Sequence, residues 1–173
     1  LPYNYNVRGE MMDVCLKNGL KVVIREARVS DAEAILVCMS KIIRETKNLA
    51  REPEEWRMDV KQETTFLQKM VESKHDYMVI TLDGDTIIST AGFHGRDLQR
   101  FQHRVTLGIS VLQAYHHQGL GTYLMNHLID KAREMGKKTI DLDVRKDNPI
   151  AIELYKKVGF YQEGIKEKAF YVD

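Results

Sequence analysis

Two glycines one residue apart stand directly before a long segment with helical periodicity, in the stretch YHHQGLGTYLMNHLI at residues 115–129. Apolar residues recur on one face of that segment and Gly136 follows its end, so the sequence predicts a strand, a glycine turn and a helix. The free N–H groups at a helix N-terminus bind anions, and glycine lets a phosphate approach the backbone closely. Taken alone, the stretch fits a phosphate site and a plain strand-to-helix turn equally well.

The common phosphate-binding loops fit this stretch poorly. The ATP and GTP loop requires Gly-Lys-Ser/Thr, whereas Gly121 is followed by threonine and tyrosine. The dinucleotide fingerprint requires a third glycine, and Leu124 occupies that position. His116 and His117 have no nearby partner at metal-ligand spacing, so we expect no metal site.

The rest of the chain alternates short predicted elements without a linker, which favours a single domain over residues 1–173. A capping box of Ser30 and Glu33 opens the first helix, Pro53 begins the second, and Asp83 and Gly84 form a hairpin turn. We expect strands at 20–27, 77–82, 86–94, 103–112, 139–144 and 160–164, and helices at 31–45, 53–73, 120–135 and 149–158. This order predicts a mixed sheet with helices on both faces, in the α/β class.

Composition excludes several classes of function. The 26 Lys and Arg residues are interspersed with 25 Asp and Glu residues, so no basic surface for nucleic acid is expected. No apolar run approaches the ~18 residues of a membrane helix, and the first residues lack the pattern of a signal peptide. Cys15 and Cys38 stand in apolar surroundings, which suits a reducing compartment. We therefore expect a soluble, cytoplasmic protein without a nucleic-acid or membrane partner.

The segment DNPIAIELYKKVGF, about 30 residues after the glycine turn, favours the phosphate-site interpretation of that turn. Together the two segments resemble the GNAT family of acetyl-CoA-dependent N-acetyltransferases. The family's phosphate loop reads Gln/Arg-x-x-Gly-x-Gly/Ala, matched at Gly119 and Gly121, and its later signature reads Asn-x-x-Ala-x-x-x-Tyr-x-x-x-Gly-Phe. Every fixed position of that signature is present, as Asn148, Ala151, Tyr155, Gly159 and Phe160. Over about residues 21–173, the resemblance implies a mostly antiparallel mixed sheet with splayed strands that form an acyl-CoA cleft.

The resemblance also implies which residues bind acetyl-CoA, the acetyl donor. In the family, loop amides hold the pyrophosphate, the preceding strand pairs with the pantetheine arm, and the asparagine of the later signature contacts the cofactor. The corresponding residues here are His116, His117, Gln118, Gly119, Leu120, Gly121 and Thr122 in the loop, Ile109, Ser110 and Val111 on the strand, and Asn148.

Tyr155 corresponds to a general acid that protonates the departing thiolate, and it also lies beside the cofactor. A phenol with a pKa of about 10 can donate a proton near neutrality. A simpler interpretation remains open for each of these two residues, because Tyr155 also fits an ordinary helical core stripe and Asn148 is a good helix N-cap.

Two positions depart from the family pattern. His116 replaces the usual Gln or Arg, which should matter little because the loop works mainly through backbone amides. Many relatives carry a glutamate near the middle of the fourth strand that relays the proton from the amine, whereas this chain has Thr106 there and no carboxylate between Asp97 and Asp130. His103, a water chain or an acid from another element remain alternatives for the base.

The leading hypothesis is direct acetyl transfer from acetyl-CoA to a primary amine of a small molecule, peptide or protein, without a covalent acyl-enzyme. The alternative, a non-catalytic acyl-CoA-binding regulatory module, is supported only by the missing carboxylate. The acceptor groove is expected at about 42–56 and 94–103. Residues 1–20 form an N-terminal extension. The family's final strand is missing from residues 1–173, so it either lies beyond Asp173 or comes from a partner subunit, and a homodimer is an open expectation because family members often dimerise.

Overall fold

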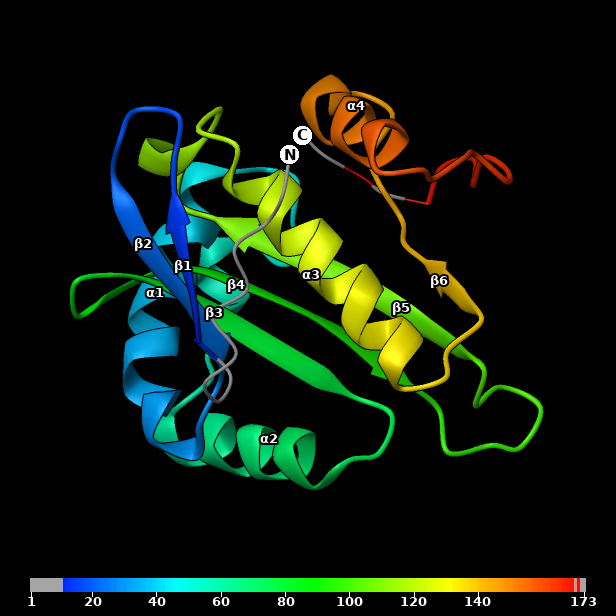
Figure 1. Ribbon diagram of the computed structural model, residues 1–173, viewed down its shortest axis with the longest axis horizontal. Helices are drawn as coiled ribbons and strands as arrows, with labels where there is room; N and C mark the ends of the chain where they lie inside the picture. Colours follow the sequence, from blue (N-terminus) through cyan, green and yellow to red (C-terminus); the bar gives the residue numbers. More distant parts are fainter. Residues whose placement is uncertain (1–10, 170, 172–173) are drawn as a thin grey trace.

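A single sheet of six strands forms the centre of the computed structural model, which describes residues 11–169 and 171 (Figure 1). The strands lie in sequence order, as β1 (Met11–Cys15), β2 (Lys21–Glu26), β3 (Tyr77–Asp83), β4 (Thr86–Gly95), β5 (Arg104–Val111) and β6 (Thr139–Asp141). Neighbouring strands are antiparallel except β5 and β6, which are parallel. The predicted mixed, mostly antiparallel sheet is confirmed.

Helices cover both faces of this sheet. On one face, α1 (Ala32–Glu45) contacts β4 and β5 while α2 (Val60–Glu72) contacts β3, and α3 (Leu120–Glu134) crosses β4 and β5 on the other face (Figure 1). The last helix, α4 (Pro149–Lys157), follows β6 at the edge of the sheet. The predicted arrangement of helices on both faces is therefore also confirmed.

Alternation along β5 decides which side chains reach each face. Val105 and Leu107 are buried, and Ile109 lies close to Gly121 at the start of α3. Because successive side chains of a strand point to opposite faces, Thr106 faces the side covered by α1 and α2. On the neighbouring strand, His94 pairs with Thr106 and contacts Phe66 of α2, which places it on the same face.

The start of α1 differs from the prediction. Asp31 is the N-cap residue of α1, so the predicted capping box of Ser30 and Glu33 is wrong. The Asp31 carboxylate accepts a hydrogen bond from the backbone N–H of Arg28 at 2.7 Å and forms a two-point ion pair with Arg25 at 2.7 and 2.8 Å. An ionised carboxylate that gains both partners satisfies this turn better than a serine hydroxyl would.

The second helix begins later than predicted. Pro53 belongs to a short 3-10 turn, Pro53–Glu55, that is separate from α2. The cap of α2 is Asp59, whose Oδ1 accepts from the Gln62 N–H at 2.8 Å while the Gln62 side chain accepts from the Asp59 N–H at 3.0 Å. This reciprocal pair fixes the N-terminus of α2 one residue before Val60.

Three strand predictions also need correction. The segment predicted as an N-terminal extension contains β1, which pairs with β2 along its whole length, while residues 1–10 lie outside the described residues. The strand predicted at 139–144 ends at Asp141, because the chain then turns away from β5. The strand predicted at 160–164 is absent from the described residues that follow α4.

Candidate functional site

The parallel strands β5 and β6 separate after a short paired length. Their pairing runs only from Arg104 opposite Thr139 to Thr106 opposite Asp141. Beyond that point residues 107–111 of β5 have no strand partner on this side within the described part of the chain. Ile109, Ser110 and Val111, predicted to pair with the pantetheine arm, lie on this open length, where backbone N–H and C=O groups can bind an extended ligand.

The glycine loop curls its backbone before α3 begins. Gly119 is the N-cap residue of α3 with φ +86°, a conformation that favours glycine, and His117 also has a positive φ of +60°. The N–H groups of Leu120 and Gly121 donate to no acceptor among the described residues, whereas Thr122 N–H bonds the Gly119 carbonyl at 3.0 Å. Free amides at a helix N-terminus form a seat for an anion such as a phosphate.

Two side chains from distant elements hold the segment that enters this loop. The backbone N–H of Gln113 donates to Glu45 Oε2 at 2.7 Å, which ties the loop to the end of α1. The Tyr115 hydroxyl donates to Asp83 Oδ2 at 2.8 Å, which ties it to the β3–β4 turn. That hydrogen bond, with burial, raises the pKa of the Tyr115 phenol, so this anchor persists through the neutral range.

His116 has a definite contact that the sequence did not predict. Its Nε2 lies 2.8 Å from the carbonyl oxygen of Val111, and because a carbonyl only accepts, Nε2 carries the hydrogen. On the other side of the loop, the Gln118 carbonyl accepts from the backbone N–H of Lys17 in the β1–β2 turn at 3.1 Å. The imidazole therefore links the loop to the end of β5, and the β1–β2 turn holds the loop through the Gln118 carbonyl.

Helix α4 packs its second turn against the start of α3. A Cβ atom placed on Gly121 would lie 2.9 Å from Leu154 Cδ2, so the missing side chain allows this close approach. Asn148 is the N-cap residue of α4, and its Oδ1 accepts from the Ala151 N–H at 3.3 Å. The two sequence signatures are thus joined in space, although the predicted contact of Asn148 with the cofactor stays a prediction.

Tyr155 lies on the half-buried side of α4. Its ring packs 6.0 Å from that of Phe160 between centroids, and its hydroxyl forms no hydrogen bond with any residue that the structure describes. Burial raises the pKa of this phenol, so Tyr155 keeps its proton through the neutral range. A protonated phenol without a protein partner can still donate a hydrogen bond to a ligand.

The carboxylate missing from β5 has a counterpart on β6. Asp141 Oδ1 accepts a hydrogen bond from Thr106 Oγ1 at 3.3 Å, and both Asp141 oxygens bind the Arg104 guanidinium at 3.1 Å. Burial raises the pKa of Asp141, but the hydrogen bond and charge of Arg104, with the Thr106 hydroxyl, lower it overall. Sequence reasoning along β5 missed Asp141 because only the parallel pairing brings it beside Thr106.

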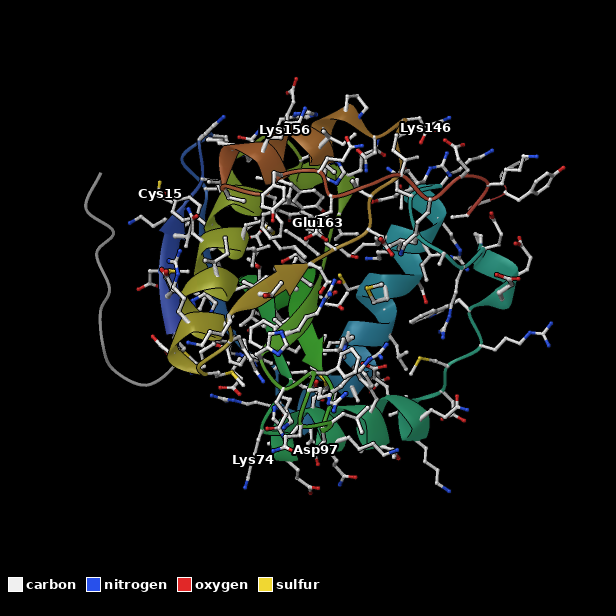
Figure 2. The ribbon with its side chains drawn as sticks, turned by 90° about the vertical axis from the view of Figure 1, so that its right-hand side faces the viewer. Cys15, Lys74, Asp97, Lys146, Lys156 and Glu163 are labelled. Carbon is white, nitrogen blue, oxygen red and sulfur yellow. The ribbon has the colours of Figure 1, made fainter. Side chains whose placement is uncertain are left out.

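The region predicted as the acceptor groove contains a small pocket of about 60 Å³ beside the end of α1. Ser40, Ile43, Arg44, Pro53 and Trp56 line this pocket. Nearby, Arg145 Nη1 donates to the Lys47 carbonyl at 2.8 Å and joins the segment after β6 to the connection between α1 and α2. Figure 2 views the molecule from the β6 side and labels Lys146, which follows Arg145 in this segment. An acceptor reaching the open edge of β5 from this side would pass these groups.

Among residues 11–169 and 171, no group of three or more His, Cys, Asp or Glu side chains is placed to hold a metal ion. Within the same residues, every helix is too short or too polar to cross a membrane.

The separated strands beside a helix N-terminus can accommodate an extended, phosphate-bearing ligand. A sequence profile of the Acetyltransferase (GNAT) family matches residues 42–160, more than half of the chain. The chain therefore belongs to the GNAT family of acetyltransferases, as its two signatures predict.

Individual relatives agree with this assignment. The N-alpha-acetyltransferase RimI of Mycobacterium tuberculosis is 34% identical over 103 residues, a match that covers 58% of this chain and 61% of the relative, less than two thirds of its length. The crystal structure of a GNAT acetyltransferase from Streptococcus pneumoniae superposes with a TM-score of 0.85 at 25% identity, covering 88% of this chain and 91% of that one. A Salmonella typhimurium protein solved with acetyl-CoA shares the fold, with a TM-score of 0.69 at 22% identity over 84% of this chain and 86% of that one.

Proposed function

We propose that the protein transfers an acetyl group from acetyl-CoA to a primary amine by direct attack of the amine on the thioester. The observation that carries this proposal is the open edge of β5 at residues 107–111, which leads to the free N–H groups of Leu120 and Gly121. Pantetheine is an extended arm with amide groups that ends in a pyrophosphate, so its chemistry fits an open strand edge followed by an anion seat.

The predicted site residues contact acetyl-CoA in this proposal, except His116, which holds the loop through the Val111 carbonyl. The amides of residues 117–121, with Thr122 beside them, bind the pyrophosphate, and Ile109, Ser110 and Val111 pair with pantetheine through their backbones. Asn148 lies at the start of α4, where its side chain caps the helix and contacts the cofactor. Tyr155 donates its phenolic proton to the departing coenzyme A thiolate, a role consistent with its raised pKa and unbonded hydroxyl.

The acceptor proposed first is the α-amine of a peptide or protein. The Mycobacterium tuberculosis relative is named an N-alpha-acetyltransferase, which points to this class of amine. An α-amine has a pKa of about 8, compared with about 10.4 for lysine, so a larger fraction is neutral and able to attack at physiological pH. We place this activity in the cytoplasm, where acetyl-CoA and new protein N-termini are both present.

The test measures coenzyme A thiol release with acetyl-CoA and a panel of amines, alongside acetyl-CoA affinity by calorimetry. The panel contains peptides with a free N-terminus, the same peptides with a blocked N-terminus and a free lysine, polyamines and aminoglycosides. Turnover with free N-termini is expected. Binding of acetyl-CoA without acetylation of any amine would instead favour the non-catalytic regulatory module.

The non-catalytic alternative rests only on the lack of a carboxylate on β5. The nearest carboxylate is that of Asp141 on β6, which accepts a hydrogen bond from Thr106 of β5. Because Arg104 binds both oxygens of Asp141, however, this carboxylate is a weak candidate for the base. The group that accepts the proton of the amine has to be sought on the neighbouring elements.

A further inference from the structure

His94 of β4 lies directly opposite Thr106 of β5. Paired residues in an antiparallel sheet have their Cβ atoms about 5 Å apart on the same face. The imidazole of His94 can therefore reach the space that a longer side chain at position 106 would occupy. Position 106 is where the family resemblance places the proton-relaying glutamate, so a histidine here stands beside the expected place of the base.

The surroundings of His94 place a carboxylate near one ring nitrogen and leave the other open. His94 Nδ1 lies 3.7 Å from Asp76 Oδ1, an oxygen that also accepts from the Gly95 N–H at 2.9 Å. This distance is too long for a hydrogen bond, so Asp76 acts on the ring through its charge. No described residue occupies Nε2, which is open to a ligand. The Phe66 ring of α2 packs 5.9 Å from the imidazole, between ring centroids.

The His94 side chain is 56% exposed, so a ligand and water can reach it. It faces the acceptor side of the sheet, the side covered by α1 and α2, together with Thr106. A histidine with one ring nitrogen near a carboxylate and the other open to a ligand is an arrangement that general bases use.

Five charged or titratable groups lie on the elements around His94. Asp76 lies in the α2–β3 connection, and its charge also acts on Lys137, where it opposes the lowering of the pKa by burial. Beyond Thr106, Asp141 and Arg104 neutralise one another in their ion pair. On α2, Glu63 lies one turn before Phe66 and is buried; burial raises the pKa of its carboxyl, which favours the neutral form. Asp76 is thus the nearest charged group that acts on the ring directly.

Other candidates for the base are less well placed. Arg104 and Thr106 already bind the Asp141 carboxylate. Both oxygens of Asp143 accept from Lys166 Nζ, at 2.7 and 2.8 Å. His103, which the sequence offered as an alternative, precedes β5 and has no strand partner that directs it toward Thr106.

We propose that His94 accepts the proton of the acceptor amine, directly or through one water, and that Asp76 positions its ring. This inference rests on the proposed acetyl transfer. The amine nitrogen forms a bond to the thioester carbon and gives its proton to His94 Nε2, and the carbon–sulfur bond breaks. The sulfur leaves with the electron pair and takes the proton of Tyr155, and His94 returns its proton to solvent while Tyr155 regains one.

The experiment compares kcat, KM and the pH dependence of kcat for the wild type, His94→Gln and His103→Gln with one peptide acceptor. His94→Gln should lower kcat by at least about 100-fold, the usual minimum for loss of a general base, with little change in acetyl-CoA affinity. His103→Gln should retain the wild-type rate. In His94→Ala, added imidazole should restore part of kcat, an effect that a merely structural role would not produce.

Asp76→Asn tests the positioning role separately. Asparagine keeps an oxygen for the Gly95 N–H but has no charge for the ring, so kcat should fall about 10-fold while the melting temperature stays close to that of the wild type. Wild-type kcat and pH dependence in His94→Gln, or a loss in His103→Gln instead, would overturn the inference alone. A wild type that binds acetyl-CoA but acetylates no amine would overturn the proposed function and this inference together.

Discussion

Gly121 of α3 lies against Leu154 of α4, because a Cβ atom at position 121 would lie 2.9 Å from Leu154 Cδ2. Real Cβ atoms do not approach a carbon so closely, so a side chain at position 121 requires Leu154 to shift. Gly121 thus serves two purposes. It provides a free amide at the helix N-terminus, and its lack of a side chain leaves space for Leu154. The two sequence signatures depend on each other through this contact.

This contact predicts that Gly121→Val destabilises the fold as well as the cofactor site. The added side chain forces Leu154 and α4 to shift, which should cost about 1–3 kcal/mol of unfolding free energy. Urea unfolding of Gly121→Val, Leu154→Ala and the double variant measures the coupling between the two positions. The double variant should recover part of the stability that is lost when the two single effects are added.

Acetyl-CoA affinity in the same double variant separates the two purposes of Gly121. Weak binding after stability has been recovered would mean that the side chain also crowds the pyrophosphate. Additive losses of stability in the double variant would contradict the contact with Leu154.

A second prediction concerns the conformation of Gly119. Its φ of +86° is costly for any residue with a Cβ atom, and its carbonyl accepts the first hydrogen bond of α3. Gly119→Ala should lower stability by about 1–2 kcal/mol and weaken acetyl-CoA binding by about 10-fold or more, because the loop amides then turn away from the ligand. Calorimetry and thermal unfolding measure the two effects.

Gly136 provides the matched control for Gly119. It has a similar φ of +72° at the end of α3, and an added Cβ would meet no atom within 4 Å. Gly136→Ala should therefore cost similar stability while acetyl-CoA affinity is unchanged. Equal loss of affinity in both variants would indicate that strain anywhere in α3, rather than the loop amides, governs binding.

A third prediction tests Tyr155 as the proton donor. Tyr155→Phe should lower kcat by about 100-fold or more and leave acetyl-CoA affinity nearly unchanged. Because burial raises the pKa of this phenol above its usual 10, the wild-type rate should show no alkaline decline from loss of this proton up to about pH 9. Tyr161→Phe, which alters a tyrosine that is 79% exposed, is the control and should have the wild-type rate. An unchanged kcat in Tyr155→Phe would reduce Tyr155 to a packing role.

Local patterns predicted the elements that carry their own signals. The apolar stripe of α3 and the stop at Gly136 are such signals, as are the Asn148 cap of α4 and the turn at Gly84 between β3 and β4. Each depends on residues a few positions apart, so the sequence contains the whole interaction. The glycine loop could be recognised in the same way, because its glycines stand next to the helix that they begin.

Contacts between distant segments were not accessible in this way. Thr106 meets Asp141 only because β5 and β6 are parallel, and His94 meets Thr106 only through the register of β4 and β5. Ser30 was predicted as the N-cap of α1, because the sequence does not show that Arg25 of the preceding strand lies beside Asp31. The missed β1 is a strand of mixed polarity that becomes recognisable only by its pairing with β2. The proton acceptor was left open for the same reason.

The buried carboxyl of Glu63 predicts a pH dependence of stability. Glu63 is 3% exposed on the inner stripe of α2, and burial raises the pKa of its carboxyl in the folded state. A carboxyl with a raised folded pKa stabilises the fold fully below its unfolded pKa of about 4.3, and this contribution is lost as pH rises through the folded pKa. Glu63→Gln keeps the shape and removes the titration, so it should raise the unfolding midpoint relative to wild type at pH 7 and have little effect near pH 4.

The control is Glu153→Gln, at an exposed glutamate of α4, which should leave the unfolding midpoint unchanged at both pH values. Thermal unfolding at both pH values measures these midpoints. Equal midpoints for Glu63→Gln and wild type at pH 7 would show that burial of the ionised Glu63 carboxyl does not destabilise the fold.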